Sequence, residues 1–109
     1  MIPDPVTVMV DRPLGSRHPK HADILYTVNY GYVEGILAGD GEEQDVYILG
    51  VDEPLKRFTG RVIAVIHRLD DVEDKWVAAP EGAVFTADEI AAKVAFQEQY
   101  FKSEITLLY

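Results

Sequence analysis

The chain has 109 residues and a formal net charge of −9, because 19 Asp and Glu side chains oppose 10 Lys and Arg side chains. This length favours a single domain over residues 1–109. With 48% hydrophobic and 27% charged residues, the composition is typical of a folded chain. The absence of cysteine excludes disulfides and thiolate metal sites. The acidic balance argues against nucleic-acid binding and, if it is functional, favours the binding of cations.

The sequence predicts neither a membrane segment nor a targeting segment. No apolar run approaches the roughly 18 residues that cross a bilayer. The opening residues, MIPDPVTVMVDRP, lack the order of a signal peptide. We therefore expect a cytoplasmic protein with no membrane partner.

Short strands dominate the first two thirds of the chain. Alternating valines predict a strand at residues 6–10, and a polar loop follows up to residue 23. β-Branched and aromatic residues then predict either two short strands or one strand bent at Gly31, within residues 24–33. Continuous apolar runs predict three more strands, at residues 46–51, 60–66 and 76–79.

One helix is expected late in the chain, over residues 87–102. Thr86 and Glu89 have the spacing of a capping box. Ile90 and Val94 lie on an apolar stripe with helical spacing. The elements together predict a mainly β (α+β) domain, a strongly curved sheet or five- to six-stranded β-barrel with the C-terminal helix packed on it. Closing the barrel would remove most strand edges.

The acidic residues concentrate in residues 40–75, which carry ten acidic and five basic side chains. They form two bursts, at residues 40–45 and 70–75, next to strong strands. Either burst alone is more often a solvated turn. Two bursts of carboxylates also match the oxygen ligands that Mg²⁺ prefers.

Three further residues are candidates for binding an anion beside such a metal. Lys75 follows the second acidic burst, Arg12 ends the first strand and Tyr30 lies in an Asn-Tyr-Gly-Tyr run. Each can donate to a phosphate oxygen. Each also has a structural interpretation: an ion pair for Lys75, a surface pair with Asp11 for Arg12, and a packed aromatic for Tyr30.

These residues belong to four motifs that occur in order. They are Val10-Asp11-Arg12; Tyr26 with Asn29-Tyr30-Gly31-Tyr32; Asp40-Gly41 with Asp45-Val46; and Asp70 with Lys75, Val77 and Pro80. Between Val6 and about Tyr100 the chain resembles the soluble family I inorganic pyrophosphatases. The resemblance implies a small OB-like barrel, Mg²⁺ as cofactor, hydrolysis of pyrophosphate to two phosphates by metal-activated water, and a homo-oligomer.

The resemblance also assigns roles to individual residues. It implies phosphate contacts for four residues and metal binding for five, with Glu42 helping to generate the attacking hydroxide. Glu42 and Glu73 stand where the family has aspartate, and Phe101 stands where it has lysine. The metal-binding residues would be Asp40, Glu42, Asp45, Asp70 (or its neighbour Asp71) and Glu73. The phosphate-binding residues would be Arg12, Tyr30, Lys75 and Tyr100.

Two further expectations concern the ends of the chain and its loops. The family has an N-terminal Glu and Lys that this sequence does not match, so we expect a short, N-terminally truncated variant. The loop at residues 17–21 either supplies replacement cations for the site or is a solvated basic loop. His67 reads as a strand-end histidine. The apolar residues 105–109 could form a partner surface.

Three functional hypotheses remain open from the sequence. The leading one is a Mg²⁺-dependent diphosphatase. The alternatives are a pyrophosphatase-like module that binds metal and phosphate without turnover, and a structural or interaction domain without a ligand.

Overall fold

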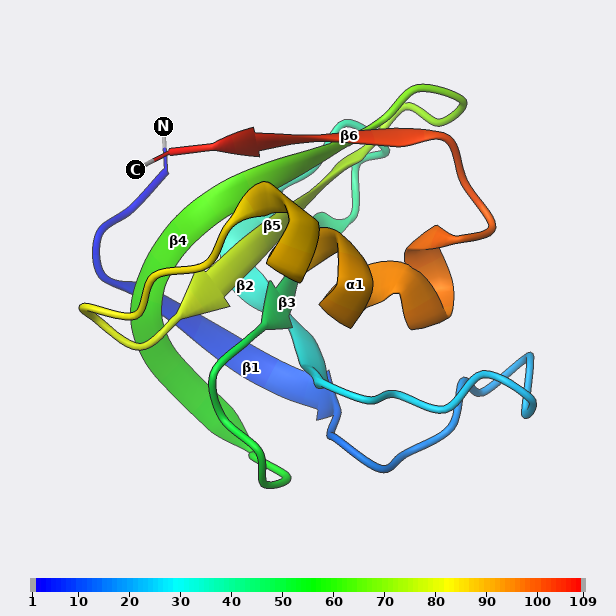
Figure 1. Ribbon diagram of the computed structural model, residues 1–109, viewed down its shortest axis with the longest axis horizontal. Coiled ribbons are helices and arrows are strands. Elements are labelled where there is room, and N and C mark those ends of the chain that lie inside the picture. The colour runs from blue at the N-terminus through cyan, green and yellow to red at the C-terminus, as the bar shows by residue number, and fades with distance from the viewer. Residues whose placement is uncertain (1, 109) are drawn as a thin grey trace.

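The computed structural model describes residues 2–108. Within this range the chain forms six strands and one helix, which confirms the mainly β fold class predicted from the sequence (Figure 1). The elements are β1 (Val6–Arg12), β2 (Asn29–Leu37), β3 (Glu43–Ile48), β4 (Arg57–Arg68), β5 (Asp74–Ala79), α1 (Ala87–Glu98) and β6 (Ser103–Leu107).

Five strands close into a barrel in the order β1-β2-β3-β5-β4, because β4 pairs back onto β1. β3 and β5 run parallel, and the other pairs are antiparallel. The 12-residue β4 curves along the barrel: its first residues pair with β1 and its last residues pair with β6 (Figure 1). The barrel thus has the small, strongly curved form that the short strands predicted.

The apolar side chains form two packed groups. One joins strand residues across the barrel, including Val8 and Ile48. The other joins the barrel to α1 and includes Tyr47, Ile90 and Val94, all at most 2% exposed. The capping box expected for this helix is present, with the Thr86 side chain accepting from the Glu89 backbone N–H. α1 is therefore fixed against the barrel along its predicted apolar stripe.

Gly31 lies inside one continuous strand and does not divide two strands. It pairs with Val10 of β1, and a Cβ at this position would overlap the backbone carbonyl of Met9. Only a residue without a side chain allows β1 and β2 to approach this closely. The strand that continues past Gly31 keeps Tyr30 in register with the end of β1.

Several strand boundaries differ by two or three residues from the sequence prediction, and three differences are larger. Residues 24–28 form no strand, because Tyr26 exchanges backbone hydrogen bonds with the loop residues Gly15 and Ser16 and buries its side chain. α1 ends at Glu98, before the expected residue 102. Residues 103–107 form strand β6 on the edge of β4, where no strand was predicted, and Leu107 and Leu108 are exposed as expected; Tyr109 lies outside the described residues. No helix within the described part of the chain is long and apolar enough to span a membrane.

Candidate active site

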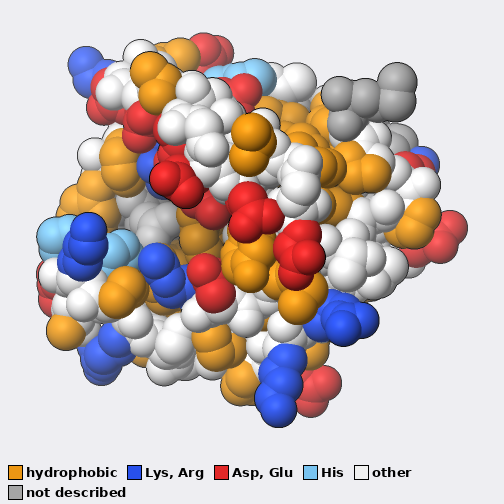
Figure 2. Space-filling model, turned by 180° about the vertical axis from the view of Figure 1, so that it is seen from behind, with side chains coloured by type: hydrophobic (Ala, Val, Ile, Leu, Met, Phe, Trp, Pro, Cys, Tyr) orange, Lys and Arg blue, Asp and Glu red, His pale blue; other side chains and the backbone are white. Residues whose placement is uncertain are grey.

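A pocket of about 330 Å³ lies where the ends of β1 and β4 meet the start of β5 and the last turn of α1. Figure 2 shows acidic and basic side chains together around a hollow on this side of the molecule. Six of the residues assigned roles from the sequence line this pocket. They are Arg12, Tyr30, Asp45, Glu73, Lys75 and Tyr100; the other lining residues are Asp11, His18, Ile24, Arg68, Gln97 and Phe101.

Arg12 reaches the pocket because the end of β1 is irregular. The β1–β2 register shifts between Val10 and Arg12, so that Arg12 lies opposite Tyr30. Its Nη1 donates to the Tyr26 hydroxyl at 2.8 Å. The interpretation of Arg12 as a surface partner of Asp11 is therefore not what the structure shows: its guanidinium is fixed at the pocket wall.

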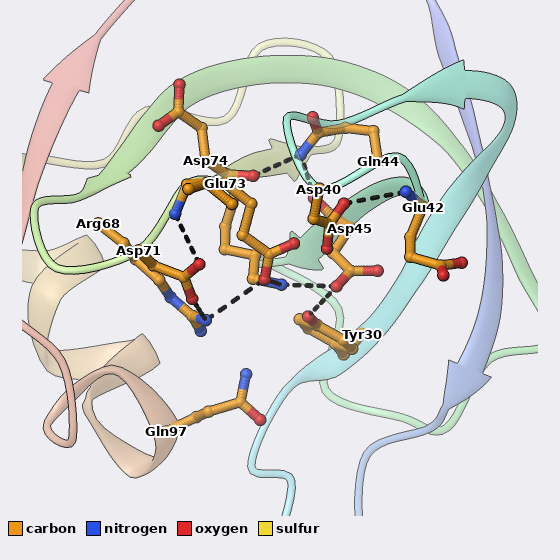
Figure 3. Close-up of polar contacts among 12 residues, drawn as sticks. Tyr30, Asp40, Glu42, Gln44, Asp45, Arg68, Asp71, Glu73, Asp74 and Gln97 are labelled. Atoms are coloured by element: carbon orange, nitrogen blue, oxygen red, sulfur yellow. Dashed lines mark hydrogen bonds and ion pairs between the residues drawn. The ribbon is translucent and has the colours of Figure 1, made fainter.

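Lys75 lies between two of the predicted metal ligands. Its Nζ is 2.6 Å from Asp45 Oδ2 and 2.6 Å from Glu73 Oε1, and its side chain is only 4% exposed. Asp45 Oδ2 also accepts from the Tyr30 hydroxyl at 2.8 Å. Burial, followed by the Asp45 charge, raises the pKa of Tyr30 well above its ordinary value, so its hydroxyl stays a donor. Figure 3 shows Tyr30, Asp45 and Glu73 turned toward one another.

Asp40 comes to the same place from the turn before β3. A hydrogen bond with the Glu73 carboxyl is the main cause of its lowered pKa. Burial is the main cause of the raised pKa of Glu73, and Asp40 adds to it against the opposing effect of Lys75. Two carboxyl groups in hydrogen-bond contact repel unless a proton or a cation is shared between them. Asp40 and Glu73 therefore form a local concentration of negative charge.

The remaining predicted metal ligands lie farther out. Glu42 is exposed, and its backbone N–H donates to Asp40 Oδ1 at 3.0 Å. Asp70 is exposed and accepts from the backbone N–H of Lys102 at 3.4 Å. Its neighbour Asp71 instead comes within 3.6 Å of the Arg68 guanidinium. None of Asp40, Glu42 and Asp70 lines the pocket, although Asp40 influences the pKa of Glu73, which does.

The remaining candidates, in the loop at residues 17–21, at His67 and at Tyr100, differ in whether they line the pocket. From the loop at residues 17–21, only His18 lines the pocket, whereas Arg17 turns back to donate to the carbonyl of Ala22. His67 lies on β4 and pairs across to Asp74 at 3.2 Å, away from the pocket lining. Tyr100 lines the pocket but is 60% exposed.

Carboxylate oxygens are the donors that Mg²⁺ prefers, and Asp40, Asp45 and Glu73 supply them around Lys75. Across residues 2–108, no group of three or more His, Asp or Glu side chains is gathered closely enough to hold a metal ion. The Lys75 ammonium lies 2.6 Å from both Asp45 and Glu73 and compensates their charges. The donor chemistry is that of a divalent-cation site, but the described residues are not gathered into one.

Sequence reasoning missed the residues that α1 and the end of β4 bring to the pocket. Arg68 and Gln97 line it, and Glu98 holds Arg68 from behind. One signal could have found them. Glu98 follows Ile90 and Val94 at helical spacing, so a carboxylate falls on the buried stripe and requires a buried cation.

No family model and no curated protein matches this sequence. Solved structures do match its fold. An inorganic pyrophosphatase from Ehrlichia chaffeensis shares 18% identity at a TM-score of 0.75, covering 99% of this chain and 88% of that one. One from Neisseria gonorrhoeae shares 26% identity at a TM-score of 0.59, covering 88% of this chain and 66% of that one.

A third structure, an inorganic pyrophosphatase from Coxiella burnetii, shares 18% identity at a TM-score of 0.59 and covers 94% of this chain and 82% of that one. The likeness extends over almost the whole barrel and the helix that packs on it. The OB-like resemblance predicted from four short motifs is therefore confirmed: the chain has the fold of the inorganic pyrophosphatases.

Proposed function

We propose that this protein hydrolyses inorganic pyrophosphate to two phosphates with Mg²⁺ as cofactor. The observation that carries the proposal is the pocket itself. In about 330 Å³ it places the cationic side chains of Arg12, Arg68 and Lys75 against the carboxylates of Asp45 and Glu73. That volume is at the lower end for small-molecule sites and suits a compact anion.

The cationic groups would bind and orient the substrate. Arg12 donates from Nη1 to the Tyr26 hydroxyl, and its other guanidinium N–H groups would donate to phosphate oxygens. Lys75 would divide its N–H donors between Asp45, Glu73 and the substrate, since an ammonium has three. Tyr30, kept protonated by its raised pKa, holds Asp45 in position through their hydrogen bond. Positioning and charge stabilisation are the main sources of acceleration in phosphoryl transfer.

Asp40 and Glu73 would hold the metal, with water and substrate oxygens completing its coordination. When bound, Mg²⁺ neutralises phosphate oxygens and lowers the pKa of a coordinated water. Glu42 and Asp70 would take no direct part, because Glu42 is exposed beside Asp40 and Asp70 is exposed beside Lys102.

Phosphate release from pyrophosphate, measured while Mg²⁺ is titrated, tests this function. We expect metal-dependent release by the wild-type protein and nearly complete loss in Asp45→Asn. Asp52→Asn, in the exposed turn after β3, is the matched control and should keep full activity. Wild-type protein that releases no phosphate at any Mg²⁺ concentration contradicts the proposal.

A second function, binding without turnover, is favoured by one observation. The Lys75 ammonium occupies the space between Asp45 and Glu73 that a shared metal ion would need. Calorimetry that detects pyrophosphate binding in protein that releases no phosphate would favour this module. An unchanged melting temperature with both Mg²⁺ and pyrophosphate would instead favour a domain without a ligand, because binding to the folded state must raise it.

A further inference from the structure

Arg68 is a buried charge at the end of β4, and the sequence motifs give it no role. Its side chain is 5% exposed and lines the pocket. Nε donates to Glu98 Oε1 at 3.1 Å and Nη2 donates to Glu98 Oε2 at 2.6 Å. Burial alone would lower the pKa of Arg68, but these hydrogen bonds raise it above its ordinary value. The group is therefore a permanent cation in a fixed position.

The third nitrogen of this guanidinium has only long contacts. Nη1 is 3.5 Å from Glu73 Oε1 and 3.6 Å from Asp71 Oδ2, both at or beyond the outer limit of a hydrogen bond. Figure 3 shows the Arg68 side chain extending toward these two carboxylates. The Phe101 ring lies 3.7 Å from the guanidinium carbon and covers one face of the group. Glu98 and Phe101 thus fix the plane of Arg68 and leave two Nη1 N–H donors without a short partner.

A buried chain of hydrogen bonds connects Arg68 to Arg12. Its links measure between 2.6 and 2.8 Å, and its centre is the last turn of α1. Both arginines at its ends line the same pocket. In order, the chain runs Arg12, Tyr26, Gln97, Tyr47, Glu98 and Arg68.

We propose that Arg68 is a second phosphate-binding arginine, which contacts one phosphoryl group of a diphosphate while Arg12 contacts the other, and that Glu98 is its positioning residue. This inference rests on the proposed function. Arg68 offers its Nη1 donors to one phosphoryl group, and two guanidinium cations held by one network suit a ligand with two phosphoryl groups. When Nη1 takes a phosphate oxygen, Glu73 and Asp71 lose only their long contacts to it.

The test measures binding of imidodiphosphate, a non-hydrolysable analogue with two phosphoryl groups, by calorimetry in the presence of Mg²⁺. Arg68→Met should weaken binding about tenfold or more, the loss expected for one charge-assisted hydrogen bond. Arg57→Met, which removes an exposed arginine at the other end of β4, should bind as wild type does.

Arg68→Met leaves the buried Glu98 carboxylate without its cation and could fail to fold. The double variant Arg68→Met/Glu98→Gln removes both charges together and should show the same loss of binding. Glu98→Gln alone should weaken binding by roughly threefold to tenfold and should have no added effect beside Arg68→Met. A merely structural Glu98 would lower the melting temperature and leave the affinity of the folded protein unchanged.

The outcomes test the role of Arg68 and the proposed hydrolysis separately. Wild-type affinity in both variants that lack Arg68 overturns the Arg68 proposal and leaves the hydrolysis proposal standing. Weakened binding in these variants, in a protein that releases no phosphate from pyrophosphate, supports Arg68 and contradicts hydrolysis. Wild-type protein that neither binds the analogue nor releases phosphate contradicts both.

Discussion

Replacement of Lys75 by methionine should destabilise the protein, and the loss should depend on pH. The substitution removes the ammonium that lies 2.6 Å from both Asp45 and Glu73. Removing one member of a buried ion pair costs about 3–5 kcal/mol, because it leaves an uncompensated charge. Asp45 keeps 32% of its side chain exposed, so solvent screens part of this cost. We expect a loss near the lower end, about 3 kcal/mol at pH 7.5.

The pH dependence follows from the carboxyl groups left behind. Without the ammonium, Glu73 loses the effect of Lys75 that opposes burial, so burial raises the folded-state pKa of Glu73 further above its unfolded value of about 4.3. A carboxyl group with a raised folded pKa loses stability as the pH rises through that pKa. The difference between wild type and Lys75→Met should therefore be small at pH 4.5 and largest at pH 7.5.

Urea denaturation at the two pH values measures this difference. Lys56→Met, at an exposed position before β4, is the matched control and should stay within about 0.5 kcal/mol of wild type. A Lys75→Met variant as stable as the control would show that Lys75 does not stabilise the fold through Asp45 and Glu73. A loss of unfolding free energy that is equal at both pH values would contradict the predicted role of their ionisation.

Three further predictions follow from the same contacts. Millimolar Mg²⁺ should raise the melting temperature of Lys75→Met more than that of wild type, because removal of the ammonium leaves Asp45 and Glu73 open to a shared cation; equal shifts by thermal melting would contradict this. The stability of Glu73→Gln relative to wild type should increase as the pH rises above 4.5. Burial raises the pKa of Glu73, so its ionisation disfavours the folded wild type. Urea denaturation at pH 4.5 and 7 measures the difference, and a difference that does not change with pH would contradict the prediction. Gly31→Ala should cost about 2 kcal/mol or more, because its Cβ overlaps the Met9 carbonyl and forces β1 and β2 apart; an unchanged melting temperature would show that the strands can separate freely.

The sequence predicted the elements whose signals are local. Alternating valines marked β1, continuous apolar runs marked β3, β4 and β5, and the capping box marked the start of α1. Strand β6 was missed because its five residues are stabilised by the edge of β4, about 40 residues earlier in the chain. Residues 24–28 were mistaken for a strand because their β-branched and aromatic side chains are typical of strands, although the backbone of Tyr26 pairs with a loop.

The same division applies to the site. Arg12, Asp45 and Lys75, which the resemblance places in one site, line the same pocket. Arg68 was overlooked because nothing near it in the sequence marks it as buried. Its partner Glu98 is 30 residues away, and the helical spacing that marks Glu98 as buried does not say which cation it pairs with. Long-range pairs of this kind are set by tertiary packing, which a local pattern does not contain.

We propose that the pocket lined by Arg12 and Lys75 hydrolyses pyrophosphate to two phosphates. Phosphorus NMR follows this directly, because the pyrophosphate resonance disappears as the orthophosphate resonance grows. We predict conversion at a rate proportional to the amount of wild-type protein, dependent on Mg²⁺ and lost in Asp45→Asn. An unchanged pyrophosphate resonance with wild-type protein and Mg²⁺, or equal conversion by Asp45→Asn, would contradict the account.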